Sequence, residues 1–401
     1  MRPQGGFSLV EMVIATGLLT LVTAGVFGMM QPAQGTYAAE PEIADMQQRL
    51  RVGADTLTRD LVMAGAGAYL GTQAGSLGYF FAPILPFRQG AIGDDPAGTF
   101  AADRITLLYV PSTTAQTTLA APLTGSAATP TLTLAAETDC PKNPVTGLPY
   151  LECGFAKDMS VLVFDDTGNY DLFSITSVTD ATAQVVVKRP ADSQNTNYPI
   201  GSKVIEAASH TYYLKTDSAN QLYQLMHYDG TSNADVPVAD HVVGLAFEYF
   251  GDPLPPVLKK PISDPGGPWT SYGPKPPAPG VKPTSWPAGE NCTFMLDGNG
   301  AHVPRLTTLG SSSAALVLLT PAQLSDGPWC PDASNLNRWD ADLLRIRKVG
   351  VTLRVEAAAD ALRGPASALF ARGGTSRGGN RWVPDQEIRF QVSPRNVNLG
   401  R

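Results

Sequence analysis

The sequence predicts an α+β protein in which one long N-terminal helix precedes an antiparallel, β-rich globular domain. Residues 7–30 are an almost continuous apolar run, and from Ile43 to Ala64 the apolar side chains recur at steps of three and four, which is the period of a helix. From about residue 100 the period changes to two, in short runs rich in β-branched and aromatic residues. Between 251 and 290 proline and glycine are so dense that no regular core element can continue, which predicts an insertion in that domain.

The first element is the apolar segment Phe7–Met30, in which Glu11 is the one ionisable residue. A helix of this length is about 36 Å long, enough to cross a hydrocarbon core of about 30 Å. A secretory signal has its small-residue cleavage site after the apolar run, whereas here Gly5 and Gly6 precede it. Arg2 places the N-terminus in the cytoplasm by the positive-inside rule. We expect a single transmembrane helix over 7–30.

Glu11 needs a partner, because a carboxylate inside an apolar span costs about 2–3 kcal/mol. Cleavage after Gly6 supplies one, since Phe7 then carries a cationic amine four residues from Glu11. The stretch GGFSLVEMVIA resembles the signature of type IV prepilins and of the pseudopilins of type II secretion. This resemblance implies a leader over 1–6 that a membrane aspartic peptidase removes, an N-methylated Phe7, and Glu11 as the carboxylate that pairs with the amine of a neighbouring subunit in assembly.

The segment 31–70 is predicted to be the soluble, amphipathic half of the same helix, ending at Gly65 or Gly67. Pro32 and Pro41 are expected to break or bend it. Its apolar face comprises Ile43, Met46, Leu50, Ala54, Leu57, Leu61 and Ala64. Its charged residues are expected mainly on the solvated side: Arg49, Arg51, Asp55, Arg59 and Asp60.

Residues 71–401 are predicted to form one β-rich domain with an insertion at about 251–340. Its strands are expected at 103–110, 159–166, 172–178, 183–189, 210–216, 222–228, 241–250, 349–356 and 387–392. In the run VGVTLRVE the apolar side chains alternate with polar ones. Four basic residues around this run are therefore expected on a solvated face: Arg345, Arg347, Lys348 and Arg354.

Several downstream stretches refine the resemblance. RLRVGADTLTRDLVMAGAG, ADHVVGLAFEYFGD, ADLLRIRKVGVTLRVEA and VSPRNVNLGR are similar to segments of PilW-type minor pilins and, more distantly, of J-type minor pseudopilins. The chain departs from them in its size and in the insertion. The resemblance implies a structural minor pilin that helps to initiate or cap a type IV pilus. Its partners are then the prepilin peptidase, other minor and major pilins, the inner membrane and the pilus assembly platform.

The same resemblance implies a location: an inner-membrane single-pass precursor with a periplasmic C-terminal domain, and then the pilus at the cell surface. Two alternatives remain open. One is a minor pseudopilin of a type II secretion system. The other is a tip adhesin that binds its ligand through the Pro-rich insertion, where Trp269, Tyr272 and Trp286 offer contact area.

Composition excludes a nucleic-acid partner. Lys and Arg number 29 against 36 Asp and Glu, for a net charge of −7, and no basic run exists that would release counterions from a phosphate backbone. The four cysteines all lie beyond the apolar span, where an even count predicts disulfides. Three connectivities are open, and we favour the pairing of sequence neighbours, Cys140 with Cys153 and Cys292 with Cys330. A zinc cluster is not predicted, because the spacings lack CxxC.

No catalytic or metal site is predicted, and we expect no enzyme. The histidines at 210, 227, 241 and 302 stand singly, as strand and loop residues do. Alternating oxygens at 165–171 and DGNG at 297–300 are typical of hairpin turns, with calcium binding as the alternative. GTSRG at 374–378 matches the G-x-S-x-G pattern of a nucleophile elbow, but the glycines around it predict a loop instead of the strand and helix that such an elbow requires. A membrane-anchored hydrolase that uses Ser376 is the remaining enzymatic alternative.

Overall fold

The computed structural model describes residues 8–67, 76–90, 95–96, 98–111, 115–138, 140–166, 168–189, 197–217, 222–230, 234–253, 257–258, 290, 292–304, 306–308, 315–331, 338–359, 362–363 and 383–398, with the backbone alone over 30–38, 257–258, 294, 302–304 and 306–308. The chain forms two compact units. The first comprises 1–51 with 354–387, and the second comprises 52–353 with 388–401.

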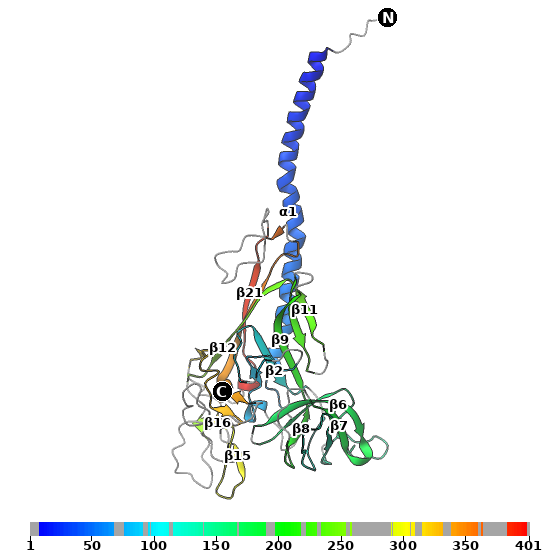
Figure 1. Ribbon diagram of the computed structural model, residues 1–401, viewed down its shortest axis with the longest axis vertical. Coiled ribbons are helices and arrows are strands. Elements are labelled where there is room, and N and C mark those ends of the chain that lie inside the picture. The colour runs from blue at the N-terminus through cyan, green and yellow to red at the C-terminus, as the bar shows by residue number, and fades with distance from the viewer. Residues whose placement is uncertain are drawn as a thin grey trace. The chain divides into compact units, whose positions relative to one another are not determined.

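The N-terminal helix α1 (Leu9–Met63) is continuous over 55 residues and is drawn in blue in Figure 1. It passes through Pro32 and Pro41 without ending, so the expectation of a helix broken at its prolines is wrong. A proline removes one backbone donor from the helix. A break would instead expose up to four N–H groups and four C=O groups at the two new ends, so the uninterrupted helix leaves fewer polar groups without partners.

The predicted apolar face of the soluble half of α1 is confirmed. Its members Met46, Leu50, Ala54, Leu57, Leu61 and Ala64 are buried, and Ile43 is half-buried. The helix ends at Met63, close to the predicted end. Gly65 follows at φ +81°, a backbone conformation that glycine adopts without strain. One residue predicted on the solvated side is buried instead, because Asp60 is only 5% exposed.

Polar contacts stabilise the first unit, both between its two chain segments and within the segment 354–387. On α1, Glu42 accepts a hydrogen bond from the backbone N–H of Ala358. Arg363 lies 3.3 Å from the buried carboxylate of Glu356, and it also donates to the Ala357 carbonyl at 2.7 Å. Buried charges of this kind are stable only with partners, and here the partners lie in the same unit.

All nine predicted strands are present in the structure. Five strands form one antiparallel sheet in the order β1-β2-β9-β10-β11. They are β1 (Ile84–Leu85), β2 (Arg104–Tyr109), β9 (Ala208–Asp217), β10 (Leu222–Tyr228) and β11 (Val236–Asp240). β9 and β10 are a hairpin in which Tyr212 lies opposite His227.

A second sheet has four strands in the order β17-β12-β20-β21. They are β17 (Val317–Leu318), β12 (Val242–Gly251), β20 (Ile346–Val355) and β21 (Gln386–Val392). The expectation of a solvated basic face on β20 is wrong for three of its four residues, since Arg345, Arg347 and Arg354 are buried. β20 has a neighbouring strand on each side, and carboxylates lie within 4 Å of Arg347 and Arg354 on this strand and of Arg345 just before it.

The third sheet closes into a barrel. Its six strands have the order β3-β8-β5-β6-β7-β4. They are β3 (Gln116–Thr118), β8 (Lys203–Glu206), β5 (Ser160–Phe164), β6 (Tyr170–Thr179), β7 (Gln184–Lys188) and β4 (Thr131–Thr133). The edge strands are joined by a bridge between Leu119 and Leu134 and by the bonds Ala120 N to Thr133 O (2.9 Å) and Ala135 N to Thr118 O (2.8 Å).

The barrel encloses an apolar core of its own, which includes Val161, Phe173, Val185 and Val204. It is inserted between β2 and β9, two strands that pair directly with Tyr109 opposite Ala208. Closing a sheet on itself removes its exposed edges, so the insertion needs no neighbour to cover them. Figure 1 shows β6, β7 and β8 of this barrel in green.

The remaining strands are short pairs within 257–340: β13 (Val257–Leu258) with β16 (Leu306–Thr308), β14 (Phe294–Leu296) with β15 (His302–Pro304), and β18 (Trp329–Cys330) with β19 (Trp339–Asp340). Four 3-10 turns complete the described elements: η2 (Leu77–Tyr79), η3 (Asp180–Thr182), η4 (Ala341–Arg345) and η6 (Asn396–Asn398). The disulfides join Cys140 to Cys153 at one loop of the barrel and Cys292 to Cys330 beside β18.

Candidate functional site

The first candidate site is the apolar half of α1. Residues Leu9–Met29 have a mean hydropathy of 2.0 and none of this stretch is buried, so by length and composition it can cross a membrane. Its large side chains are open, with Leu9 81% and Met29 82% exposed. Exposed apolar area costs roughly 25 cal/mol per Å² in water, so this half of the helix requires lipid or other apolar helices around it.

Glu11 has a local role that the sequence reading overlooked. Ser8 is the residue before the helix, and its hydroxyl accepts a hydrogen bond from Val10 N at 3.3 Å. Glu11 accepts one from Ser8 N at 3.0 Å. The two residues form a variant of the capping box, in which the Ser8 hydroxyl accepts from the second helical N–H instead of the third, and its S-x-x-E signature is visible in the sequence. The carboxylate also lies at the positive end of the helix dipole, which offsets part of its cost in an apolar medium.

The hydroxyls of this half are satisfied inside the helix. Thr16 donates to the Met12 carbonyl at 2.9 Å, Thr20 to the Thr16 carbonyl at 3.0 Å, and Thr23 to the Leu19 carbonyl at 2.6 Å. Buried hydroxyls without partners would cost several kcal/mol in hydrocarbon. The threonines therefore do not oppose insertion into a membrane.

Three glycines lie on the same half, at 17, 25 and 28. A Cβ built on any of them meets no atom within 4 Å. No contact among the described residues therefore requires glycine there, whereas small residues let two membrane helices approach closely. The processing residues Gly6 and Phe7 lie outside the described residues.

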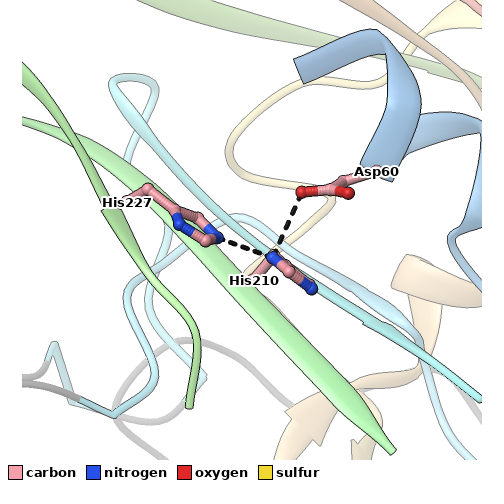
Figure 2. A group of neighbouring side chains, drawn as sticks. All are labelled: Asp60, His210 and His227. Atoms are coloured by element: carbon pink, nitrogen blue, oxygen red, sulfur yellow. Dashed lines mark hydrogen bonds and ion pairs between the residues drawn. The ribbon is translucent and has the colours of Figure 1, made fainter. Parts of the chain in front are cut away.

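The second candidate site is a polar cluster in the second unit, at the last turn of α1. Asp60 comes from α1, Tyr109 from β2, His210 and Tyr212 from β9, and His227 from β10. The strand register explains why they meet. Side chains two apart on a strand share a face, so His210 and Tyr212 point the same way, and His227 lies opposite Tyr212. Asp60 reaches this face from the helix end (Figure 2).

Asp60 is the centre of the cluster. Its Oδ2 lies 3.2 Å from His210 Nδ1, and the same oxygen accepts the hydroxyl of Tyr212. Its Oδ1 accepts the hydroxyl of Tyr109 at 3.2 Å. Figure 2 shows Asp60 and His227 on either side of His210 Nδ1, which lies 2.6 Å from His227 Nε2.

Burial determines the protonation of this cluster. It lowers the pKa of His210, against the opposing charges of Asp60 and Asp229. It also lowers the pKa of His227, with a further contribution from His210. Both imidazoles are thus favoured in the neutral form, which carries a lone pair on one nitrogen. Burial, the Asp60 charge and the hydrogen bonds to it raise the pKa of Tyr109 and Tyr212, so both hydroxyls keep their protons.

A third group comprises Asp326, Asp340 and Asp342. Asp340 caps η4 by accepting from Asp342 N at 2.7 Å, and its other oxygen accepts from Gly327 N at 2.6 Å. Burial, and then the charge of Asp342, raise the pKa of Asp340 well above its usual value. These bonds give Asp340 a structural role as a helix cap and loop anchor.

The two calcium-like runs are hairpin turns. Asp165 accepts from Asn169 N at 3.1 Å and from Asn169 Nδ2 at 2.9 Å, and it closes the turn between β5 and β6. Asp297 accepts from Asn299 N at 2.9 Å and from Ala301 N at 2.8 Å between β14 and β15. Asp165 and Asp297 therefore use their carboxylates on the loop backbone or on a loop amide.

Several residues singled out in the sequence lie outside the described residues: Ser376 and the aromatic residues Trp269, Tyr272 and Trp286. Of the histidines, 210 and 227 come together, whereas His241 lies between β11 and β12 and His302 is on β15. The signal that could have found this pair was the hairpin between two strands, each of which carries a histidine on the face toward α1.

A family model for the prokaryotic N-terminal methylation motif matches residues 1–27. No curated protein matches the chain. The motif and the apolar helix together support an N-terminus of the type IV prepilin superfamily. The motif implies processing by a prepilin peptidase and association with other pilins.

Proposed function

We propose that this protein is a structural, non-enzymatic subunit of a type IV pilus, a minor pilin that helps to initiate or cap the filament. One observation carries the proposal: the methylation motif over 1–27 overlaps an apolar helix that none of the described residues covers over Leu9–Met29. A pilin-like helix of this kind is a membrane anchor in the precursor and part of an apolar filament core after assembly.

The mechanism is electrostatic registration inside an apolar medium. After cleavage between Gly6 and Phe7, the new Phe7 amine of one subunit meets Glu11 of its neighbour. Glu11 Oε2 accepts from Ser8 N, and a carboxylate has lone pairs for further donors. The capping box therefore fixes the position of the carboxylate while leaving capacity for the incoming amine. At low dielectric the paired state is strongly favoured over an unmatched carboxylate.

The size of the globular region supports a minor subunit. A six-stranded barrel inserted between β2 and β9 enlarges the subunit. Such bulk suits a subunit present in few copies at a filament end more than one that repeats along the shaft. Similarity to PilW-type minor pilins supports the same assignment, and a pseudopilin of a type II secretion system is the nearest alternative.

The proposal is tested by two substitutions at the N-terminus. Gly6→Val should block processing, so that an unshifted precursor remains on a gel. Glu11→Val should be processed normally and should fail to enter sheared filaments. Glu11→Gln is the matched variant that separates the two roles of Glu11. Its amide oxygen can still accept the hydrogen bond from Ser8 N, but it has no charge to pair with the Phe7 amine. If Glu11→Gln and Glu11→Val are both incorporated like the wild type, the registration mechanism is wrong.

Deletion of 253–288 separates an assembly role from an adhesin role. Loss of piliation on deletion supports assembly. Normal piliation with loss of adhesion supports a tip adhesin instead. Secretion of folded exoproteins, measured in a Glu11→Val strain, distinguishes the pseudopilin alternative, because in that case secretion is lost while pili are unaffected.

A further inference from the structure

The Asp60 cluster has the donor set and the placement of a metal site. Asp60 Oδ2, His210 Nδ1 and His227 Nε2 all lie within 4.8 Å of one another, and they come from three different elements of the second unit. One carboxylate with two imidazoles is a ligand set for late divalent transition metals, because imidazole nitrogen suits Zn²⁺ better than it suits Ca²⁺ or Mg²⁺.

The hydrogen bonds of Tyr109 favour the neutral tautomer of His210 that a metal requires. Tyr109 has a single proton, and its neighbours are Asp60 Oδ1 at 3.2 Å and His210 Nε2 at 3.1 Å. A carboxylate can only accept, so the Tyr109 proton goes to Asp60, and His210 Nε2–H donates to the Tyr109 oxygen. His210 Nδ1 then carries a lone pair that faces Asp60 Oδ2 and His227.

With the His210 proton on Nε2, Nδ1 and Asp60 Oδ2 are two acceptors that face each other at 3.2 Å. In the cluster as it stands, the contact with His227 Nε2 at 2.6 Å requires a proton between the two ring nitrogens. Acceptors that converge on one point are the arrangement that a cation stabilises.

The distances suit a tetrahedral ion after a small adjustment. Two ligands on Zn²⁺, each bound at about 2.0–2.1 Å, lie roughly 3.3 Å apart. The oxygen–nitrogen distance of 3.2 Å already meets this value. The two histidines must separate from 2.6 Å by several tenths of an ångström. Both imidazoles are only partly buried, which leaves a path for the ion and a position for water as the fourth ligand.

We propose that Asp60, His210 and His227 bind one Zn²⁺ ion, which joins the end of α1 to the β9–β10 hairpin. Tyr109 and Tyr212 orient the ligands through their hydrogen bonds to Asp60, as second-shell partners of metal ligands do. The nearby charge of Asp229 adds to the attraction for a divalent cation. On binding, the His227 proton moves from Nε2 to Nδ1 by exchange with water, and both rings stay neutral.

The test uses the full chain in detergent micelles, stripped with a chelator and dialysed. Titration with Zn²⁺ in a calorimeter should give one ion per chain, and Co²⁺ should give the visible absorption of a tetrahedral site. Ca²⁺ and Mg²⁺ should give neither signal. Two substitutions should each weaken Zn²⁺ binding at least 100-fold: Asp60→Asn and His227→Gln. Tyr109→Phe, which keeps all three ligands, should weaken it about 10- to 100-fold.

His302→Gln is the matched control, since His302 is on β15 and is not one of the three proposed ligands. Circular dichroism and non-reducing gel mobility verify that each variant is folded. The proposal is overturned if the stripped wild type takes up no Zn²⁺. It is also overturned if His227→Gln and Asp60→Asn bind as the wild type does, which would place the ion elsewhere. Neither result bears on the role of Glu11, because filament incorporation is measured separately.

Discussion

Arg347 on β20 gives the sharpest stability prediction, because its charge is almost fully removed from water. Its side chain is 1% exposed, and Nε lies 2.9 Å from Oδ2 of Asp252, whose side chain is 3% exposed. Its Nη1 also donates to the carbonyls of Leu344 at 2.9 Å and Ile346 at 3.1 Å. Arg347→Met keeps most of the apolar volume and removes the cation and these donors.

The expected loss is about 3–5 kcal/mol in the free energy of unfolding, because a buried carboxylate is left without its guanidinium. The double variant Arg347→Met/Asp252→Leu should recover most of it, since an apolar pair of similar volume replaces a buried ion pair at little or no cost. Lys348→Met is the matched control on the same strand. Lys348 bonds Gln391 at the surface at 2.9 Å, and an exposed pair contributes no more than about 1 kcal/mol.

The assay is urea unfolding of the full chain in detergent micelles with the disulfides intact. Tryptophan fluorescence reports the transition, with Trp339 fully buried in the second unit. Coincident transitions by circular dichroism establish that the comparison uses one unfolding step. The reasoning is refuted if Arg347→Met loses less than about 1 kcal/mol, or if the double variant is no more stable than the single one.

The remaining predictions concern close packing, the disulfides and the membrane half. Gly251→Ala should lower the free energy of unfolding by about 2–4 kcal/mol, because a Cβ there overlaps the Arg345 carbonyl oxygen. A loss below about 1 kcal/mol in urea unfolding would contradict this packing. Cys330→Ser should lower the free energy of unfolding more than Cys153→Ser does, because the Cys292–Cys330 disulfide closes a loop of 38 residues and the Cys140–Cys153 disulfide one of 13. The chain-entropy estimates are about 3.9 and about 2.9 kcal/mol. Thermal unfolding measures both variants, and the reverse order of stability would contradict this reasoning. Gly17→Leu should leave processing and monomer stability unchanged but reduce filament incorporation, whereas wild-type incorporation would exclude a packing role for that glycine.

The sequence predicted the secondary structure well where a local period decides it. The helical face from Met46 to Ala64 and all nine strands follow from steps of three and four or of two. It failed where tertiary contacts decide. β20 lies between two strands, so the alternation that indicated a solvated basic face instead directs Arg347 to a buried carboxylate. The closure of the barrel depends on β3 and β4, which are too short to show a period.

The candidate sites divide in the same way. The N-terminal motif is contiguous, so Glu11 and the S-x-x-E cap can be read directly from the sequence. The Asp60 cluster combines residues up to 167 positions apart, from Asp60 to His227. A single aspartate on the charged side of a helix and isolated histidines on strands give no local signal. The register of β9 with β10 brings the two histidines together, and the packing of the helix end adds the carboxylate.

The placement of the barrel bears on how this chain could be altered by engineering. The chain enters the barrel after Tyr109 and leaves it before Ala208, and these two residues face each other across paired strands. Strand ends in that position can be joined by a tight turn. The barrel can therefore be deleted as one segment while the β2–β9 pairing stays in place. The same two ends are expected to accept a foreign domain whose termini lie close together. If the chain assembles as a pilus subunit, this position offers a place to display that domain on the filament.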